Sequence, residues 1–299
     1  MALQHTTERN QHLKTELEDY GLINTILPLL DDMDLTVDDL KYFQELSPYL
    51  ILDGHRTGVR NENASPAHGY VEGAQFSLRF ASVLKKLGGK QATFLIHTLR
   101  NYKTMDRMEV IFDAITDVGK KFVSKAYEKN IKLRYYGHEV HDSYAMADII
   151  NRAEEFTKNC SGFDLYYLTN YSEQWGVDNQ SELESLPDIN VIGRFTKGHY
   201  SGANIPGHTN EANFVYIQQA SIAENWTGRE LIILALSLLK SHLALKGHVG
   251  GKSYVGTEKA RIKSARENEL WEDNYLVGTE IPHKRITSFS PKGPITIKF

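Results

Sequence analysis

Polar and charged residues collect where short apolar segments of this chain end. Asp53 and Gly54 follow the apolar run 49–52, and the polar stretch 97–102 follows the apolar run 92–96. A carboxylate followed by glycine at the end of a buried strand can hold Mg²⁺ against the diphosphate of a ligand, while backbone N–H groups of the turn approach the phosphate oxygens. The alternative is a turn aspartate that only caps the next segment. These two interpretations stay open on Asp53 and its neighbours alone.

The elements that must position these residues show in the hydrophobic pattern. Five short segments rich in β-branched and aromatic residues are typical of strands, namely 49–53, 92–98, 131–136, 163–168 and 189–192. Between them, apolar residues recur at helical spacing in 76–87, 108–122 and 147–156, and Gly88 and Gly89 end the first of these helices.

Strands that alternate with helices indicate right-handed crossovers, so we expect an α/β fold with a mostly parallel central sheet flanked by helices. Ligands of such sheets bind beyond the carboxyl ends of the strands. This rule selects Asp53, the stretch 97–102 and Asn170.

The pattern predicts three parts along the chain. Residues 1–46 form a helical N-terminal extension, 47–246 a catalytic-type domain, and 247–299 a C-terminal extension that is loosely structured with one short helix. The histidines His199, His208 and His248 fit no zinc spacing and are interpreted as loop residues.

Composition limits the classes of function. The 299 residues are 41% hydrophobic and 24% charged with a formal net charge of −4, which argues against nucleic acid as a partner. Cys160 is the only cysteine, so an intramolecular disulfide and a Cys-based zinc site are excluded. Residues 1–21 contain no apolar run of signal-peptide type, and no segment approaches the roughly 20 apolar residues that span a bilayer. We therefore expect a cytoplasmic protein without a membrane span.

The polar segments, taken in order, resemble the motifs of the cis-prenyltransferases, the family of undecaprenyl diphosphate synthase. That family carries Asp-Gly-Asn after its first strand, where this chain has Asp53-Gly54-His55. The resemblance continues through six later segments and covers roughly residues 47–245. These are 69–73, 97–102, 131–137, 155–171, 191–196 and 213–224, the last of which resembles a helix whose Glu contributes to the metal site.

The resemblance implies a prenyltransferase of isoprenoid biosynthesis with Mg²⁺ as its cofactor. On the matching positions, Asp53, His55 and Asn101 would be catalytic, and Asp53 with Glu224, or a residue one position away, would hold the metal. The substrate-binding residues would be Gly54, Arg56, Thr98, Arg100, Tyr102 and Arg194. Arginine suits diphosphate because its planar guanidinium pairs with two oxygens at once.

Several positions depart from the family pattern. His55 replaces the Asn of Asp-Gly-Asn, Tyr70 replaces a helix-start His, and Pro66 stands where the family has a phosphate-binding Arg. Arg100 and Tyr102 replace an acidic residue and a Trp. The site for the allylic diphosphate is the more altered, and its charge could be rebuilt by His55, Arg56, Arg60, His68 and Arg100.

The expected reaction joins short isoprenyl diphosphates, such as dimethylallyl, isopentenyl or geranyl diphosphate, into a short or irregular branched prenyl diphosphate. The pairing of Asp-Gly-x-Arg with Asn-Tyr also resembles the subgroup that makes lavandulyl-type diphosphates. Two alternatives stay open: a terpene cyclase on the same fold, and a non-catalytic partner subunit of a cis-prenyltransferase. The resemblance also implies a homodimer, for which the apolar stretch 231–245 is a candidate interface.

Overall fold

A sheet of eight strands organises the part of the chain that the computed structural model describes. The described residues are 23–55, 66–96, 98, 116, 119, 121–137, 146–196, 204–210, 212–249, 285–290 and 293–298. The strand order is β3-β4-β2-β1-β5-β6-β7-β8. The first six strands in this order are parallel to one another, whereas β7 is antiparallel to β6 and β8 is antiparallel to β7. The strands are β1 (Pro48–Ile51), β2 (Gln91–Leu95), β3 (Ile131–Tyr136), β4 (Phe163–Leu168), β5 (Val191–Phe195), β6 (Asn213–Ile217), β7 (Arg285–Ser290) and β8 (Gly293–Lys298).

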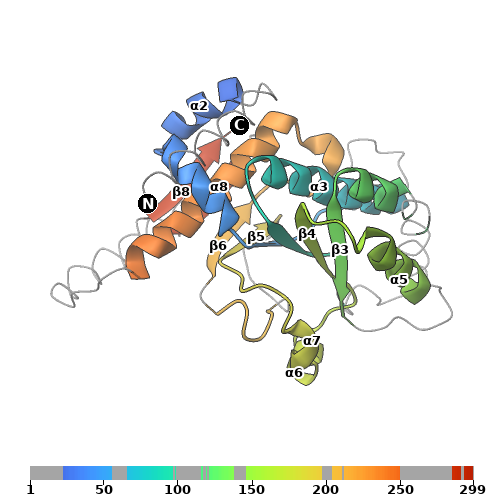
Figure 1. Cartoon of the computed structure of the whole chain (residues 1–299). Helices are drawn as coiled ribbons and strands as arrows, with labels where there is room; N and C mark the ends of the chain where they lie inside the picture. The colour runs from blue at the N-terminus through green and yellow to red at the C-terminus, as the bar shows by residue number, and fades with distance from the viewer. Residues whose placement is uncertain are drawn as a thin grey trace, which may run out of the picture.

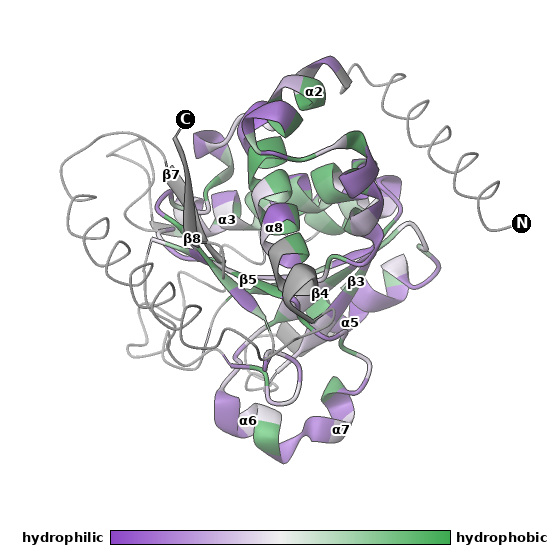
Figure 2. Cartoon of the chain, turned by 90° about the vertical axis from the view of Figure 1, so that its left-hand side faces the viewer, coloured by the Kyte–Doolittle hydropathy of each residue, from purple (hydrophilic) through white to green (hydrophobic). Residues whose placement is uncertain are grey.

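Helices cover both faces of this sheet. Figure 1 shows α3 and α8 together on one face and the short helices α6 and α7 on the other, and Figure 2 shows the same layers from the side. The described helices are α2 (Ile23–Asp32), η1 (Val37–Gln44), α3 (Pro66–Lys86), α5 (Met146–Thr157), α6 (Glu173–Asp178), α7 (Gln180–Leu183), η4 (Ala223–Asn225) and α8 (Gly228–Val249), and residues 121–128 are also helical.

The strands divide their side chains between two cores because successive residues of a strand point to opposite faces. On β1, Leu50 belongs to the core under α3 and α8, whereas Tyr49 and Ile51 belong to the core on the α6–α7 side. On β4, Tyr167 and Tyr166 divide in the same way. Burial on both faces explains why these strands are apolar throughout rather than alternating.

Helix α3 follows the predicted spacing. Phe76 and Phe80 are fully buried, and each contributes about 1.5–3 kcal/mol on burial. The helix ends where predicted, because Gly88 adopts a left-handed φ of 92° and the Gly89 N–H donates to the Leu84 carbonyl at 2.8 Å.

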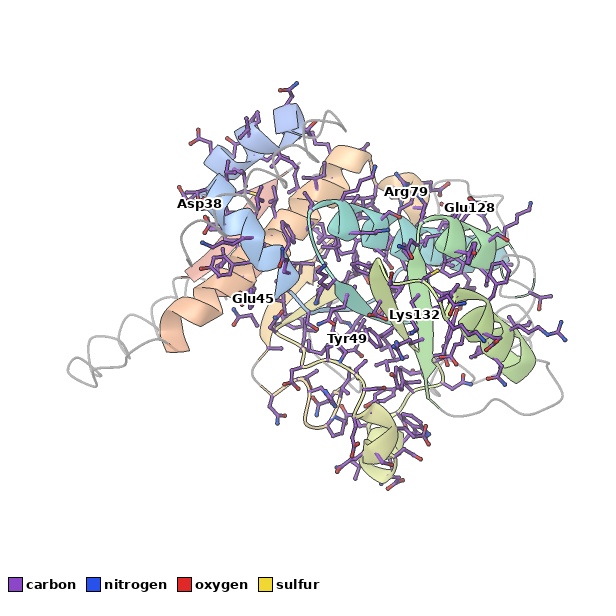
Figure 3. The ribbon with its side chains drawn as sticks, in the orientation of Figure 1. Asp38, Glu45, Tyr49, Arg79, Glu128 and Lys132 are labelled. Atoms are coloured by element: carbon purple, nitrogen blue, oxygen red, sulfur yellow. The ribbon has the colours of Figure 1, made fainter. Side chains whose placement is uncertain are left out.

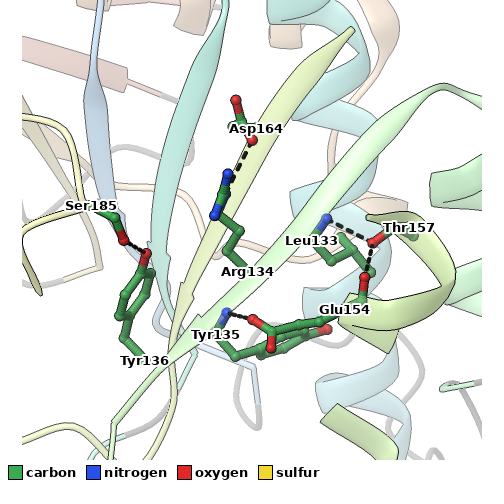
Figure 4. A network of polar contacts seen from close by, with 8 residues as sticks. All are labelled: Leu133, Arg134, Tyr135, Tyr136, Glu154, Thr157, Asp164 and Ser185. Atoms are coloured by element: carbon green, nitrogen blue, oxygen red, sulfur yellow. Dashed lines mark hydrogen bonds and ion pairs between the residues drawn. The ribbon is translucent and has the colours of Figure 1, made fainter. Parts of the chain in front are cut away.

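The outer strand β3 is closed by side chains of α5, as Figure 4 shows. The Leu133 N–H donates to Thr157 Oγ1 at 3.1 Å, and the Tyr135 N–H donates to Glu154 Oε1 at 2.8 Å. These bonds satisfy backbone N–H groups that would otherwise be open to hydrogen bonding with another strand, so a further strand cannot pair with β3 at these two positions. The pair Arg134–Asp164 ties β3 to β4 at 3.2 Å.

The predicted α/β fold and mostly parallel sheet are confirmed. All five predicted strands are present, and α3 and α5 match the predicted helices at 76–87 and 147–156. Most of the third predicted helix, 108–122, lies outside the described residues.

Two predictions of local structure were wrong. The segment 213–224, expected to be a helix, begins with strand β6 and contains only the short helix η4, because Phe214, Val215 and Ile217 favour a strand that pairs with β5. The C-terminal segment, expected to be loosely structured, contributes β7 and β8 to the sheet beyond β6. Residues 250–284, where the predicted short helix would fall, lie outside the described residues.

The N-terminal helix α2 packs into the same core as the sheet. Ile26, Leu29 and Leu30 are buried there, and Lys240 of α8 donates to the Met33 carbonyl. Among the helices that the structure describes, none is long and apolar enough to cross a membrane.

Candidate functional site

The sheet has a point where its connections diverge, between β1 and β5. The chain leaves β1 toward β2 on one side and leaves β5 toward β6 on the other, so the carboxyl ends of β1 and β5 lie at a topological switch point. Ligands of open α/β sheets bind at this kind of position. Asp53 lies two residues after the end of β1, and Arg194 lies on β5.

Strand register brings Asp53 and Arg194 together. Arg194 is the Cα partner of Ile51, and Asp53 lies two residues after Ile51, so all three side chains share one face. Arg194 Nη2 lies 3.4 Å from Asp53 Oδ2, and the Arg194 side chain is only 7% exposed. Within the described part of the chain, Arg194 Nε is buried without a hydrogen-bond partner. A buried guanidinium with an unused N–H donor is suited to bind an anion.

The turn after Asp53 needs glycine. Gly54 has a φ of 85°, and a Cβ built on it would lie 2.7 Å from Thr196 Cγ2 and 2.8 Å from Ala220 Cβ. Its N–H donates to Asp53 Oδ1 at 2.8 Å. The turn therefore holds one carboxylate oxygen through its own backbone, while the other faces Arg194.

His55 turns inward from this loop and is 8% exposed. Its Nε2 lies 3.1 Å from Ser221 Oγ, and its ring meets Tyr70 edge-on with centroids 5.8 Å apart. Burial lowers the pKa of His55 to about 4, against the opposing effect of the Asp53 charge. The ring is thus neutral in the free protein at ordinary pH.

The second predicted acidic residue, Glu224, lies on η4 beside the start of α3. Its N–H donates to Glu72 Oε2 at 2.9 Å, and its Oε2 lies 3.7 Å from His68 Nε2. Arg79 of α3 (Figure 3) donates to the carbonyls of Ala223 and Trp226. These contacts fix the loop of Glu224 against α3.

Thr98 is placed at the same end of the sheet. It forms an isolated parallel bridge with Tyr171, which follows β4, and Asn170 before it has a left-handed φ of 49°. The other predicted site residues, Arg56, Arg100, Asn101 and Tyr102, lie outside the described residues, as does Arg60.

The described part of the chain contains no group of three or more His, Cys, Asp or Glu side chains that could hold a metal ion by themselves. Mg²⁺, however, is commonly held by one or two carboxylates together with substrate phosphates rather than by an all-protein cage. Asp53 is a carboxylate of this kind, so the residues present fit Mg²⁺ bound jointly with a diphosphate.

The interior under α3 is filled with aromatic rings. Phe76 contacts Phe195 at 5.2 Å and Phe80 stacks on Phe76 at 6.0 Å, while Phe94 lies 6.5 Å from Phe80 and 6.0 Å from Tyr167. All five rings are buried, and the Tyr167 hydroxyl bonds Ser77 Oγ at 2.7 Å. This end of the apolar core is packed with side chains.

Sequence reasoning missed Glu72 and Ser221. Glu72 lies four residues after His68, so both face one side of α3, and a carboxylate on the apolar helix was an available signal. No sequence pattern indicated Ser221, because it contacts Asp53 only through tertiary packing of its loop, and the two residues are 168 positions apart in the sequence.

Comparisons with known proteins agree with this geometry. Residues 51–191 match the family model described as putative undecaprenyl diphosphate synthase. An isoprenyl transferase of Enterococcus faecalis is 24% identical over 145 residues, 44% of this chain and 54% of the relative. An isoprenyl transferase of Streptococcus mutans is 21% identical over 169 residues, 56% of this chain and 67% of the relative. The matched regions thus span about half and two thirds of these relatives.

Two solved structures share the fold. Lavandulyl diphosphate synthase from Lavandula x intermedia, in complex with dimethylallyl diphosphate, has a TM-score of 0.56 at 13% identity, over 64% of this chain and 94% of that chain. A probable undecaprenyl diphosphate synthase from Campylobacter jejuni has a TM-score of 0.50 at 14% identity, over 64% and 93%. The fold is that of the cis-prenyltransferases.

The sequence matches fall on the same family as the resemblance described above, and the activity that this family implies is proposed below.

Proposed function

We propose that this chain is an Mg²⁺-dependent prenyltransferase that condenses short isoprenyl diphosphates. An allylic diphosphate would react with isopentenyl diphosphate or with a second allylic diphosphate, and the product would be a short or irregular branched prenyl diphosphate. Dimethylallyl diphosphate is the first candidate substrate, because it is bound in the lavandulyl diphosphate synthase that shares the fold.

The observation that carries this proposal is the pairing of Asp53 with Arg194 at the β1–β5 switch point, where Asp53 Oδ2 and Arg194 Nη2 lie 3.4 Å apart. Arg194 brings a positive charge that is almost fully removed from water and keeps a donor unused among the described residues. A diphosphate would supply the missing acceptor, and charge-assisted bonds to a buried guanidinium are the strong kind.

In this proposal Asp53 would hold Mg²⁺, with Glu224 as a second acidic group from η4. When bound, the metal would supply positive charge that stabilises a leaving diphosphate. Arg194 would share that task because its Nη2 lies beside the Asp53 carboxylate, and the turn N–H of Gly54 keeps that carboxylate oriented. The allylic C–O bond breaks with both electrons going to the diphosphate, and a C–C bond forms from the second substrate's double bond with loss of a proton.

The packed aromatic interior supports a short product. The space between α3 and the sheet is filled by the rings of Phe76, Phe80, Phe94 and Tyr167. Their centroids lie 5.2–6.5 Å from one another or from that of Phe195. A long apolar chain would need these buried rings to move, and overpacking a filled core typically costs about 1–3 kcal/mol per inserted group.

A homodimer and a cytoplasmic location complete the proposal. The buried part of α8 does not provide the dimer surface, because Leu231 and Leu234–Leu239 lie within the chain's own core. A dimer would therefore use other surfaces, and sedimentation analysis of the purified protein would test its existence.

The test is a product assay on the purified protein with Mg²⁺. Dimethylallyl diphosphate is supplied alone and then together with isopentenyl diphosphate, and the products are identified by mass spectrometry after phosphatase treatment. We expect a prenyl product from at least one mixture. A cyclised product from one diphosphate would replace the proposal with a terpene cyclase. Absence of product from both mixtures and from geranyl diphosphate would contradict it.

A further inference from the structure

Ser221 makes a set of contacts that the proposed chemistry does not yet use. Its N–H and its Oγ lie 3.2 and 3.0 Å from the carbonyl oxygen of Asp53, and His55 Nε2 lies 3.1 Å from the same Oγ. Ser221 is completely buried. A serine that gives two donors to one carbonyl is committed to that carbonyl.

The Ser221 hydroxyl has one hydrogen to share between its two contacts. We assign this hydrogen to the Asp53 carbonyl, which can only accept. The bond to His55 is then donated by the ring, so Nε2 carries a hydrogen. His55 thereby holds the hydroxyl of Ser221 in the orientation that reaches Asp53.

The Asp53 carbonyl belongs to the same planar peptide unit as the Gly54 N–H. Ser221 holds the oxygen of that unit, and the N–H on its other side donates to Asp53 Oδ1 at 2.8 Å. Fixing the oxygen therefore fixes the direction of the N–H, and through it the carboxylate. The path runs from His55 to Ser221, across one peptide plane, to the carboxylate that faces Arg194.

The loop that carries Ser221 is itself anchored. Trp226 Nε1 donates to the Ala220 carbonyl at 2.8 Å, and Glu72 accepts the Glu224 N–H. Arg79 of α3 also donates hydrogen bonds to two carbonyls of this loop, so the loop that carries Ser221 is bonded to α3. Asp53 is thus oriented against a rigid support rather than by its own turn alone.

We propose that His55 and Ser221 are positioning residues that orient the Asp53 carboxylate for a magnesium diphosphate. This inference rests on the proposed function for its ligand. Neither residue needs to touch the ligand, since both act through the Asp53–Gly54 peptide.

The test uses Ser221→Ala, which keeps the backbone donor and removes the hydroxyl. The matched control is Ser237→Ala, a buried serine of α8 whose Oγ donates to its own helix at the Ile233 carbonyl. Calorimetric titration with inorganic diphosphate and Mg²⁺ measures binding without requiring turnover, and thermal unfolding reports any general loss of stability. His55→Gln is the conservative variant, because its amide can still donate to Ser221.

We expect Ser221→Ala to weaken magnesium diphosphate binding about tenfold, the equivalent of losing one hydrogen bond. We expect Ser237→Ala to leave binding unchanged at a similar change in Tm, and His55→Gln to bind more tightly than His55→Ala. Wild-type affinity in Ser221→Ala would overturn the positioning role. A wild-type protein that binds magnesium diphosphate but forms no prenyl product would refute the proposed function alone, whereas failure of the wild-type protein to bind would overturn both.

Discussion

A single methyl group on Gly73 would collide with the ring of His55. Gly73 lies inside α3, and a Cβ built on it would be 2.4 Å from His55 Nε2, 2.7 Å from Cε1 and 2.8 Å from Cδ2. All three distances are shorter than a carbon can approach, so Gly73→Ala would force the ring away from Ser221. Propensity alone predicts the opposite sign, because Gly→Ala inside a helix stabilises by about 0.5–1 kcal/mol.

The steric effect should win. Overpacking costs about 1–3 kcal/mol, and breaking the buried His55–Ser221 bond adds about 1–3 kcal/mol. After the propensity gain is subtracted, Gly73→Ala should destabilise the protein by about 1–5 kcal/mol. Denaturant unfolding followed by fluorescence would measure this change in the free energy of unfolding.

The matched experiment removes the ring first. In the His55→Asn background the shorter side chain leaves room for the methyl group, so Gly73→Ala should there be neutral or stabilising. The two substitutions would then show a coupling energy of about 1–6 kcal/mol, which is the difference between the effect of Gly73→Ala in the wild-type protein and in His55→Asn. If Gly73→Ala stabilised the wild-type protein as much as it stabilised His55→Asn, the packing described for His55 would be refuted.

Two further predictions concern stability away from the site. Glu154→Ala removes the acceptor of the Tyr135 N–H on the outer strand β3 and should lower the free energy of unfolding by about 1–3 kcal/mol. The control Glu155→Ala changes an exposed side chain and should alter it by no more than about 0.5 kcal/mol. Equal effects of the two substitutions would contradict the closing of this edge by α5. Tyr167→Phe removes the buried bond to Ser77 and should cost about 0.5–1.5 kcal/mol with the fold intact, and a stabilising effect would contradict that bond.

Much of the fold follows from local pattern. The five strands were predicted from their β-branched and aromatic composition. Helix α3 was predicted from the spacing of residues such as Phe76 and Phe80, which lie on its buried face. The prediction for 213–224 failed because a resemblance was followed against the residues, since the run Asn213–Ile217 has strand composition. Strands β7 and β8 had a comparable signal in the Ile- and Thr-rich segments on either side of residues 291–292.

The site divides in the same way. Asp53 and Arg194 could be predicted because each lies at a strand end, and parallel register brings such ends together. Ser221 could not be predicted, because it reaches Asp53 only through loop packing that leaves no periodic trace. The role of His55 could not be predicted either, because its ring fits beside Gly73 only through the tertiary packing of the loop against α3.

The most direct test of the central claim compares Asp53→Asn with wild type in the product assay with Mg²⁺. Asp164→Asn is the control, because it makes the same chemical change on β4, where Asp164 pairs with Arg134. The account predicts a loss of product formation of about 100-fold or more in Asp53→Asn, as for removal of one group that stabilises developing charge, and a rate close to wild type in Asp164→Asn. Full activity in Asp53→Asn would contradict the claim that chemistry occurs at the carboxyl ends of β1 and β5.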